Sequence, residues 1–489
     1  MTLPFAPGAG EAGPTPGQGT TPGQRPTPGE RPTPGQGPAP DARAVGQPRL
    51  VTGIELVGEF EGSGYRDPPQ LVCRPDGQLV RLPGLLYQVV RALDGANGPS
   101  GERRDGPRPD GAPKSVRKDE PVMARVAAEL SRETGRQFTE EHIAYLIDQK
   151  LAPLSLTTYS DGSPPPPARR NDPFLAFRFR LAVLPEHITW FVSGLFAWLF
   201  HPLLILFSVC AFVVGEAWLW TTQETGIALQ AVLSSPGSIL FVVFLAIASC
   251  VFHEWGHGAA CRYGGVRPGA MGCGIYLVWP AFYTDITNSY RLGRAGRIRA
   301  DLGGVYFNAL FVLGLLGLYV ATGFQPLLVA ILSVNLEIVQ QLLPTLRFDG
   351  YYIVADLIGI PDLFKYIGPI LRRVVLRRPK DDRLKALKRW PQIVVAFWVL
   401  FLIPVLLLQL GILVLNLPQL LVSDWQQARL LIENAGASGN QVLGMTSACL
   451  QILLLALPVA GLVLILWGAA RSLVRFVGRK AGWSGADGG

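Results

Sequence analysis

Six long apolar runs constrain this 489-residue chain more than any other feature of its sequence. Each run is about as long as a helix needs to be, at a rise of ~1.5 Å per residue, to cross a hydrocarbon layer of ~30 Å. The runs cover residues 202–220, 238–260, 302–321, 326–343, 393–415 and 449–467. Hydrophobic residues make up 49% of the chain, which is typical of the same class. The sequence therefore predicts a mainly α-helical, polytopic membrane protein.

The second apolar run ends in the pentapeptide HEWGH at residues 253–257. On a helix this spacing places His253 and His257 one turn apart on one face, so both imidazoles can reach one metal ion, with Glu254 as candidate general base. Chance could produce the same pattern, but ionisable residues at membrane depth are costly and usually functional. Only five histidines occur in the chain, and two of them lie here. The pattern therefore predicts a zinc (Zn²⁺) site.

A third zinc ligand has to come from elsewhere, because catalytic zinc usually takes three protein ligands and leaves one position for water. Asp349 follows the fourth apolar run and should emerge at the depth of the two histidines. Gly350 would let the chain turn sharply there. An ordinary helix-end or loop carboxylate is the alternative, but the matching depth favours metal ligation by Asp349.

The distribution of basic residues predicts the orientation in the membrane. The connections at residues 221–237 and 322–325 contain no Lys or Arg, and the long connection expected at 416–448 contains only Arg429. Lys and Arg are instead concentrated before the third run and, at residues 371–389, before the fifth. By the positive-inside rule, we expect a multi-pass plasma-membrane protein with both termini in the cytoplasm. Because the net charge of +8 gathers beside apolar runs, we expect no nucleic-acid partner.

Composition predicts five parts along the chain. Residues 1–48 repeat a Pro-Thr-Pro-Gly theme with almost nothing apolar to bury, which is typical of a disordered tail. Residues 50–156 have the composition of a small cytosolic α+β domain. We expect a linker at 157–185, the membrane-embedded domain at 186–475 and a flexible tail at 476–489.

Within residues 50–156, three strand patterns precede three helical patterns. The strands are expected at 54–60, 70–74 and 78–82, and the helices at 85–93, 122–130 and 139–150. A stretch rich in Gly, Pro and charge separates the first two helices and predicts a flexible insertion. Thr139 and His142 form a capping-box pattern that lacks the usual Glu.

This order of elements predicts a winged-helix-like fold and resembles PqqD-like peptide-recognition domains. The resemblance implies that the domain binds a leader peptide as an added strand beside the hairpin. A regulatory or purely structural cytosolic domain is the alternative.

The combination of HEWGH within an apolar run and a DG pair two runs later resembles the site-2 protease family of intramembrane zinc metalloproteases. More narrowly, FYTDITNSYR at residues 282–291 and RFDGYYIVADLIGIP at 347–361 resemble its peptide zinc metalloprotease subgroup. Members of that subgroup often accompany peptide-maturation or export systems. The resemblance covers roughly residues 170–480.

Site residues carry over from this resemblance one by one. It implies that His253, His257 and Asp349 bind zinc and that Glu254 is the catalytic base. In the segment GGVYFN, Asn308 would help to orient the substrate or an oxyanion. The chain departs from the family pattern before the DG pair, where it has Leu343-Pro344 and relatives commonly have Asn-Pro. The departure bears on how this segment positions a substrate.

Two further stretches have more than one interpretation. Residues 265–283 alternate loosely between Gly and Pro breaks and could form a hairpin near the active site, with an edge for an extended substrate, or could pack at the membrane surface. The fourth run contains four polar residues, which either line a water or substrate path or hydrogen-bond neighbouring helices. They are Asn335, Glu337, Gln340 and Gln341.

The function we expect is that of a zinc metalloendopeptidase acting on a peptide or membrane-protein substrate in or near the bilayer, in peptide maturation or export. The alternative is a non-proteolytic peptide-binding or export accessory protein with a structural zinc site. Expected partners are the substrate, the lipid bilayer, a leader peptide at the N-terminal domain and exporter components.

Overall fold

The computed structural model describes residues 47–97, 121–168, 177–276, 279–345, 347–379, 381–437 and 440–480. The chain divides into two units. The membrane unit holds Asp172–Gly489 together with the short segment Glu61–Arg66, and the N-terminal unit holds Leu3–Phe60 and Asp67–Asn171. The predicted flexible insertion and nearly all of the N-terminal tail lie outside the described residues. Residues 169–176 of the predicted linker and most of the C-terminal tail also lie outside them.

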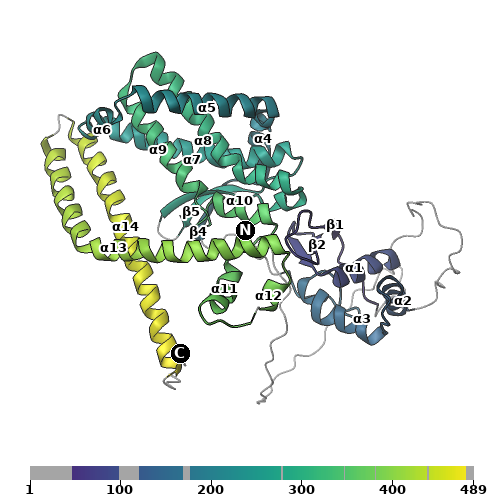
Figure 1. Cartoon of the computed structure of the whole chain (residues 1–489). Coiled ribbons are helices and arrows are strands. Elements are labelled where there is room, and N and C mark those ends of the chain that lie inside the picture. Colours follow the sequence, from purple (N-terminus) through teal and green to yellow (C-terminus); the bar gives the residue numbers. More distant parts are fainter. Residues whose placement is uncertain are drawn as a thin grey trace, which may run out of the picture. The chain divides into compact units, whose positions relative to one another are not determined.

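The N-terminal unit combines an antiparallel sheet with three helices, as its sequence patterns predict (Figure 1). The strands, in the order β1-β2-β3, are β1 (Glu55–Glu59), β2 (Gln70–Cys73) and β3 (Leu79–Leu82). The helices are α1 (Gly84–Asn97), α2 (Val122–Thr134) and α3 (Glu140–Leu146). Apolar side chains from the sheet and all three helices, among them Val72, Leu93, Val126 and Ile143, form one buried core.

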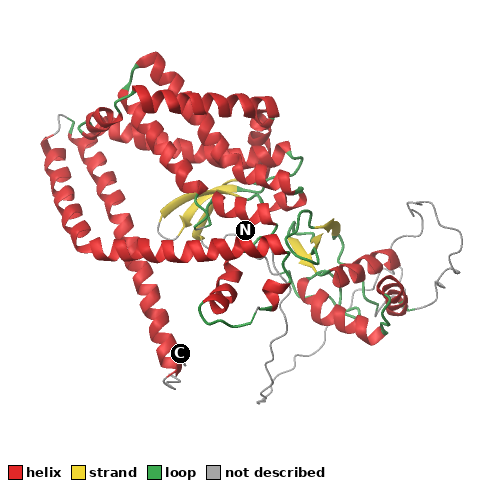
Figure 2. Cartoon of the chain, viewed as in Figure 1, coloured by secondary structure: helices red, strands yellow, loops and turns green. Residues whose placement is uncertain are grey.

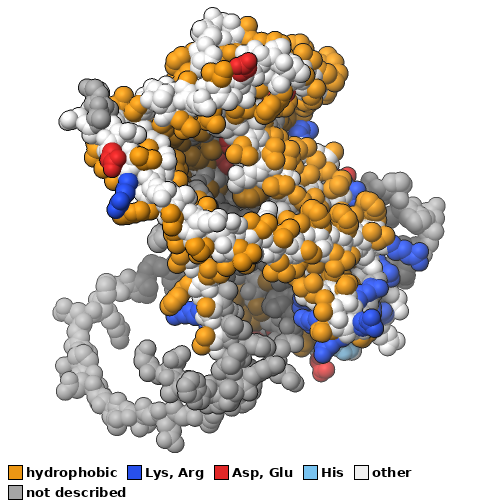
Figure 3. All heavy atoms as spheres, turned by 60° about the vertical axis from the view of Figure 1, so that its left-hand side comes forward, with side chains coloured by type: hydrophobic (Ala, Val, Ile, Leu, Met, Phe, Trp, Pro, Cys, Tyr) orange, Lys and Arg blue, Asp and Glu red, His pale blue; other side chains and the backbone are white. Residues whose placement is uncertain are grey.

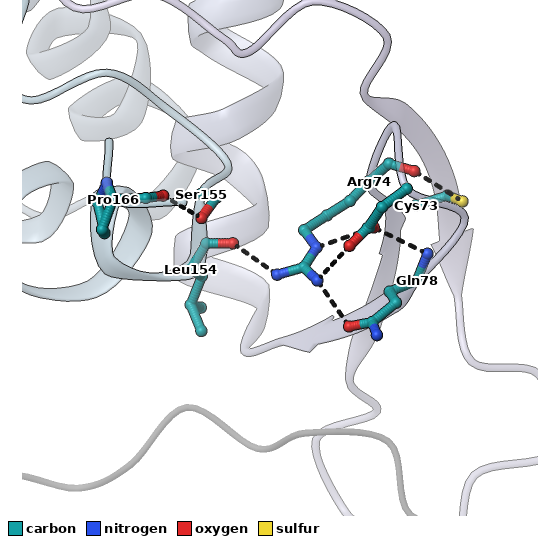
Figure 4. A network of polar contacts seen from close by, with 7 residues as sticks. Cys73, Arg74, Gln78, Leu154, Ser155 and Pro166 are labelled. Carbon is teal, nitrogen blue, oxygen red and sulfur yellow. Dashed lines mark hydrogen bonds and ion pairs between the residues drawn. The ribbon is translucent and has the colours of Figure 1, made fainter. Parts of the chain in front are cut away.

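Two polar arrangements stabilise this unit locally. At the start of α3, Thr139 Oγ1 accepts a hydrogen bond from His142 N, and Thr139 N donates to His142 Nδ1, so an imidazole takes the place of the usual Glu. At the β2–β3 turn, the buried Arg74 guanidinium donates to Asp76 Oδ2 at 2.7 Å and to Gln78 Oε1 at 2.6 Å (Figure 4). Arg74 also donates to Leu154 O, which ties the hairpin to the end of the helical part.

The membrane unit contains, among the described residues, six helices long and apolar enough to cross a membrane (Figure 2). They are α5 (Pro202–Thr222), α7 (Pro236–Tyr263), α8 (Arg294–Thr322), α9 (Gln325–Leu342), α13 (Arg389–Ala437) and α14 (Gln441–Lys480). The prediction of a mainly α-helical polytopic protein is confirmed. Two shorter helices, α4 (Glu186–Phe196) and α6 (Thr225–Leu233), precede α5 and α7.

The long connection expected at residues 416–448 is largely helical. Helix α13 continues to Ala437 and α14 begins at Gln441, so helical structure fills nearly all of that stretch. A proline inside a helix removes one backbone hydrogen bond and can bend the helix without ending it. Both Pro404 and Pro418 lie within α13, and Figure 1 shows this helix bending along its course.

A second antiparallel sheet lies beside the helices of the membrane unit, in the order β4-β5-β6 (Figure 2). Its strands are β4 (Phe177–Leu184), β5 (Met271–Tyr276) and β6 (Trp279–Thr284). The hairpin expected within residues 265–283 is confirmed by β5 and β6. Strand β4 was not expected, because residues 177–184 fall in the predicted linker and their partner strand lies about 90 residues further along the chain.

Candidate metal centre

Close contact between α7 and α8 builds the wall of the site. A Cβ atom on Gly256 would lie 2.2 Å from Gly303 O, and one on Gly303 would lie 2.6 Å from Gly256 O. On the next residue of α8, a Cβ on Gly304 would lie 2.3 Å from His253 Nε2. Small residues let membrane helices approach closely, so the glycines of the GGVYFN segment leave room for the other backbone and for an imidazole.

Three potential metal ligands converge in this space. His253 Nε2 and His257 Nε2 lie 3.2 Å apart, and Asp349 Oδ2 lies 3.1 Å from the first nitrogen and 3.4 Å from the second. Both imidazoles are buried, with 2% and 6% of their residues' surface exposed. The structure therefore brings together the three residues that the sequence predicts as a ligand set.

The hydrogen bonds around these atoms show which of them carry lone pairs. His257 Nδ1 lies 2.8 Å from Ala300 O, and because a carbonyl oxygen only accepts, Nδ1 donates and the neutral ring has its lone pair on Nε2. That lone pair faces a carboxylate oxygen, and the contact is favourable only with positive charge between them.

The dimensions of the triangle test whether a zinc ion fits. In a tetrahedral zinc site with bonds of about 2.0–2.1 Å, neighbouring ligand atoms lie about 3.3–3.4 Å apart. The three observed separations, 3.1, 3.2 and 3.4 Å, are close to this value. An imidazole bound to zinc usually donates its other N–H to a carbonyl or carboxylate, as His257 does to Ala300 O. The residues present therefore fit a zinc ion.

The carboxyl group of Glu254 is held by a residue from the sheet. Ligand atoms of His253, Glu254 and His257 all lie within 4.8 Å of one another. Thr284, the last residue of β6, donates its hydroxyl to Glu254 Oε2 at 2.7 Å and lies 2.9 Å from Glu254 O. Since the hydroxyl occupies Oε2, the other carboxylate oxygen is left for a proton. Sequence reasoning missed Thr284, because its contact with Glu254 depends on the fold of the hairpin.

Asn308 lies one helical turn beyond Gly304 on α8 and is completely buried. Ser249 Oγ donates to Asn308 Oδ1 at 3.2 Å, which orients the amide. The Asn308 amide also faces the carboxyl group of Glu337 on α9, with which it interacts. Ser249 precedes His253 by four residues on α7, so helical spacing from the HEWGH motif is the signal that could have identified it.

Asp349 is the first residue of α10 (Asp349–Ile358). The reason given above for Gly350 was wrong: this residue lies within the helix and has no left-handed backbone, but its Cβ would lie 2.2 Å from Leu342 O. Glycine is required there by close packing against the end of α9. The Leu343-Pro344 pair, which stands where relatives commonly have Asn-Pro, is also held in place: the Pro344 carbonyl accepts a hydrogen bond from Trp398 Nε1 at 2.6 Å.

Asn335, one of the four polar residues of α9, has a hydrogen-bond partner on α5. Asn335 Nδ2 donates to Glu216 Oε1 at 2.9 Å, and the other oxygen of Glu216 accepts from Trp220 Nε1. Asn335 therefore hydrogen-bonds a neighbouring helix, since this bond joins α9 to α5.

Similarity to known proteins agrees with this chemistry. A Bacillus subtilis (strain 168) protein named "Putative peptide zinc metalloprotease protein YydH" is 24% identical over 170 residues, which are 34% of this chain and 66% of that protein. The match thus spans just under two thirds of the relative's length. No protein-family model and no solved structure matches the chain.

Proposed function

We propose that the protein is a zinc metalloendopeptidase of the site-2 protease type, which cleaves a peptide or membrane-protein substrate in or near the bilayer. The observation that carries the proposal is the convergence of His253, His257 and Asp349 on one zinc-sized space beside Glu254. The similarity to a protein named as a peptide zinc metalloprotease supports the same reaction class.

His253, His257 and Asp349 would hold the metal. When bound, zinc supplies a Lewis acid that polarises a carbonyl and lowers the pKa of water to about 7. Glu254 accepts the proton of the attacking water on its free oxygen and passes it to the leaving amine. Thr284 keeps the carboxylate turned for this transfer, and Asn308, whose amide is oriented by Ser249, would help to orient the substrate.

The outer edge of β6 is the proposed binding surface for the substrate. This strand pairs with β5 on one side only, among the described residues, and it ends at Thr284 beside the catalytic base. A helical substrate shields its carbonyl groups and has to unwind before attack. Adding the unwound segment to β6 as an extended strand satisfies its backbone groups and leads it toward Glu254.

The setting of this reaction also belongs to the proposal. The basic residues described above favour cytoplasmic termini and a plasma-membrane location. A leader peptide bound by the N-terminal unit and exporter components as partners would fit a role in peptide maturation or export.

The experiment that tests the function is Glu254→Gln in purified, detergent-solubilised protein. Hydrolysis of a library of synthetic single-span peptides, followed by mass spectrometry, should fall about 100-fold or more, since the general base is lost. Bound zinc per chain should not change. Glu433→Gln on the exposed side of α13 is the matched control and should cleave like the wild type.

Two outcomes contradict the proposal. Undiminished cleavage by Glu254→Gln would exclude the assigned mechanism. Zinc binding by a wild-type protein that cleaves no member of the library would instead favour a peptide-binding or export accessory protein with a structural zinc site.

A further inference from the structure

The segment Glu61–Arg66 is part of the membrane unit, although its chain neighbours on both sides belong to the N-terminal unit. Its backbone is hydrogen-bonded on two sides. Gly64 N donates to Gly359 O at 3.0 Å, directly after α10, and Gly64 O accepts from Lys388 N at 2.9 Å, directly before α13. Tyr65 forms a β-bridge with Leu387. The segment thus fills the space between the end of α10 and the start of α13.

Basic side chains hold three successive carbonyl groups of this segment. Arg297 Nη2 donates to Glu61 O at 3.0 Å, Arg294 Nη2 to Gly62 O at 2.7 Å, and Lys388 Nζ to Ser63 O at 2.9 Å. Hydrogen bonds from charged donors are stronger than those between neutral groups. The path of the segment is therefore defined by the membrane unit itself.

Glycine contacts show how closely the segment approaches α10. A Cβ atom on Gly64 would lie 2.2 Å from Ile358 O, the last carbonyl of α10. Gly359 ends that helix with a φ of +68°, and its Cβ would lie 2.1 Å from Gly62 O. Because these contacts are with backbone atoms, a side chain at either position would have to push the two segments apart.

Arg297 connects the segment to the helix that carries Asp349. Its side chain is completely buried, and besides the bond to Glu61 O its Nε donates to Asp356 Oδ1 at 3.2 Å. Asp356 lies two turns beyond Asp349 on the ten-residue helix α10. A displacement of the segment would therefore act on this short helix at its far end and through Asp356.

We propose that Glu61–Arg66 is a positioning element of the metal centre, which clamps the end of α10 and so holds Asp349 at ligand distance from the two histidines. The inference rests on the proposed function in one respect, because it takes Asp349 as a metal ligand.

The main test compares Gly64→Ala with Gly84→Ala in the full-length, detergent-solubilised protein. An added Cβ at Gly84 meets no atom within 4 Å, so this variant is the matched control. Zinc affinity is measured by competition with a chelating dye, and ligand geometry by the visible absorption of the Co²⁺-substituted protein. Gly64→Ala should weaken zinc binding about tenfold or more and change the cobalt spectrum, as loss of supporting contacts does at metal sites. Gly84→Ala should change neither.

A second pair of variants keeps the test decisive if Gly64→Ala does not accumulate in the membrane. The double variant Arg294→Ala/Lys388→Ala removes two exposed donors to the segment without adding bulk. It should weaken zinc binding about threefold or more, given the usual worth of hydrogen bonds. Arg294→Lys/Lys388→Arg keeps both positive donors and should restore binding.

The results separate this inference from the proposed function. Wild-type zinc affinity and an unchanged cobalt spectrum in both Gly64→Ala and the double alanine variant would overturn the positioning role, whatever the protein cleaves. Zinc binding that responds to Gly64→Ala in a protein without peptidase activity would support the positioning role and contradict the protease. Failure of the wild type to bind zinc at all would overturn both.

Discussion

The helix pairs α7–α8 and α13–α14 are both long and apolar, but they pack in different ways. Between α7 and α8 the backbones touch at Gly256 and Gly303, and buried polar side chains lie along the interface. Between α13 and α14 lies a groove of about 150 Å³ that is lined mostly by leucines and also by Asp424. Leu415 on α13 is 81% exposed, and apolar side chains cover much of the helical surface in Figure 3.

This difference shows that hydropathy does not separate a helix that carries candidate metal ligands from one whose apolar surface is largely exposed. In a bilayer, lipid tails solvate leucine as well as another helix does, so close packing and hydrogen bonds have to hold membrane helices together. The α7–α8 pair has both, and the α13–α14 pair has few interhelical polar contacts among the described residues. We therefore expect single substitutions to have large effects in the first pair and small effects in the second.

The largest effect is expected from Gly256→Ala. The new methyl group would lie 2.2 Å from Gly303 O, so α7 and α8 would have to separate. Overpacking of this kind costs about 1–3 kcal/mol, and the separation would also move His253 and His257 relative to Asp349. We expect a lower unfolding temperature and loss of most bound zinc, measured by thermal unfolding and by metal analysis of the purified protein.

Gly411→Ala on α13 is the control for this substitution. An added Cβ meets no atom within 4 Å there, and alanine favours a helix by about 1 kcal/mol over glycine. It should keep wild-type zinc content and unfold no earlier. Equal losses in the two variants would contradict the contrast between the helix pairs.

An intermediate effect is expected from Thr284→Val, which keeps the shape of the side chain but removes the donor to Glu254 Oε2. Since the carboxylate would lose its fixed orientation, kcat should fall about tenfold, whereas KM and zinc content should stay within about twofold. Thr284→Ser keeps the hydroxyl and should recover most of the activity.

The matched control is Thr446→Val on α14, where the hydroxyl bonds only to Val442 O of its own helix. This variant should cleave like the wild type. A change in KM with kcat intact in Thr284→Val would show that Thr284 acts in substrate binding and does not orient the Glu254 carboxylate.

Local spacing made part of the site predictable. His253 and His257 are four residues apart on one helix, so their meeting needs no tertiary information. Asp349 required one more step, the alternation of membrane spans, and the structure brings it to both imidazoles. Thr284 could not be predicted, because its approach to Glu254 follows from the register of β6 against β5.

The fold shows the same limit. The six candidate spans could be identified from the length of their apolar runs, because a helix must be apolar over about 20 residues to cross the hydrocarbon layer. Strand β4 was not predicted, because the sequence of its eight residues does not indicate that they pair with β5 so far along the chain. The contacts of Glu61–Arg66 with Arg297 were equally hidden, since backbone carbonyls 236 residues away carry no sequence signature.

The smallest effect is expected from Asp424→Leu in the groove between α13 and α14. Asp424 is only partly buried among the leucines of the groove, so replacing it with an apolar side chain should improve the packing of this pair slightly or leave it unchanged. Because nothing in the proposed mechanism uses Asp424, cleavage and zinc affinity should stay within about twofold of the wild type. Thermal unfolding and the peptide-library assay measure the two effects. A loss of cleavage above about tenfold with zinc still bound would make the α13–α14 pair part of the proposed catalytic machinery. It would contradict the contrast between the two helix pairs.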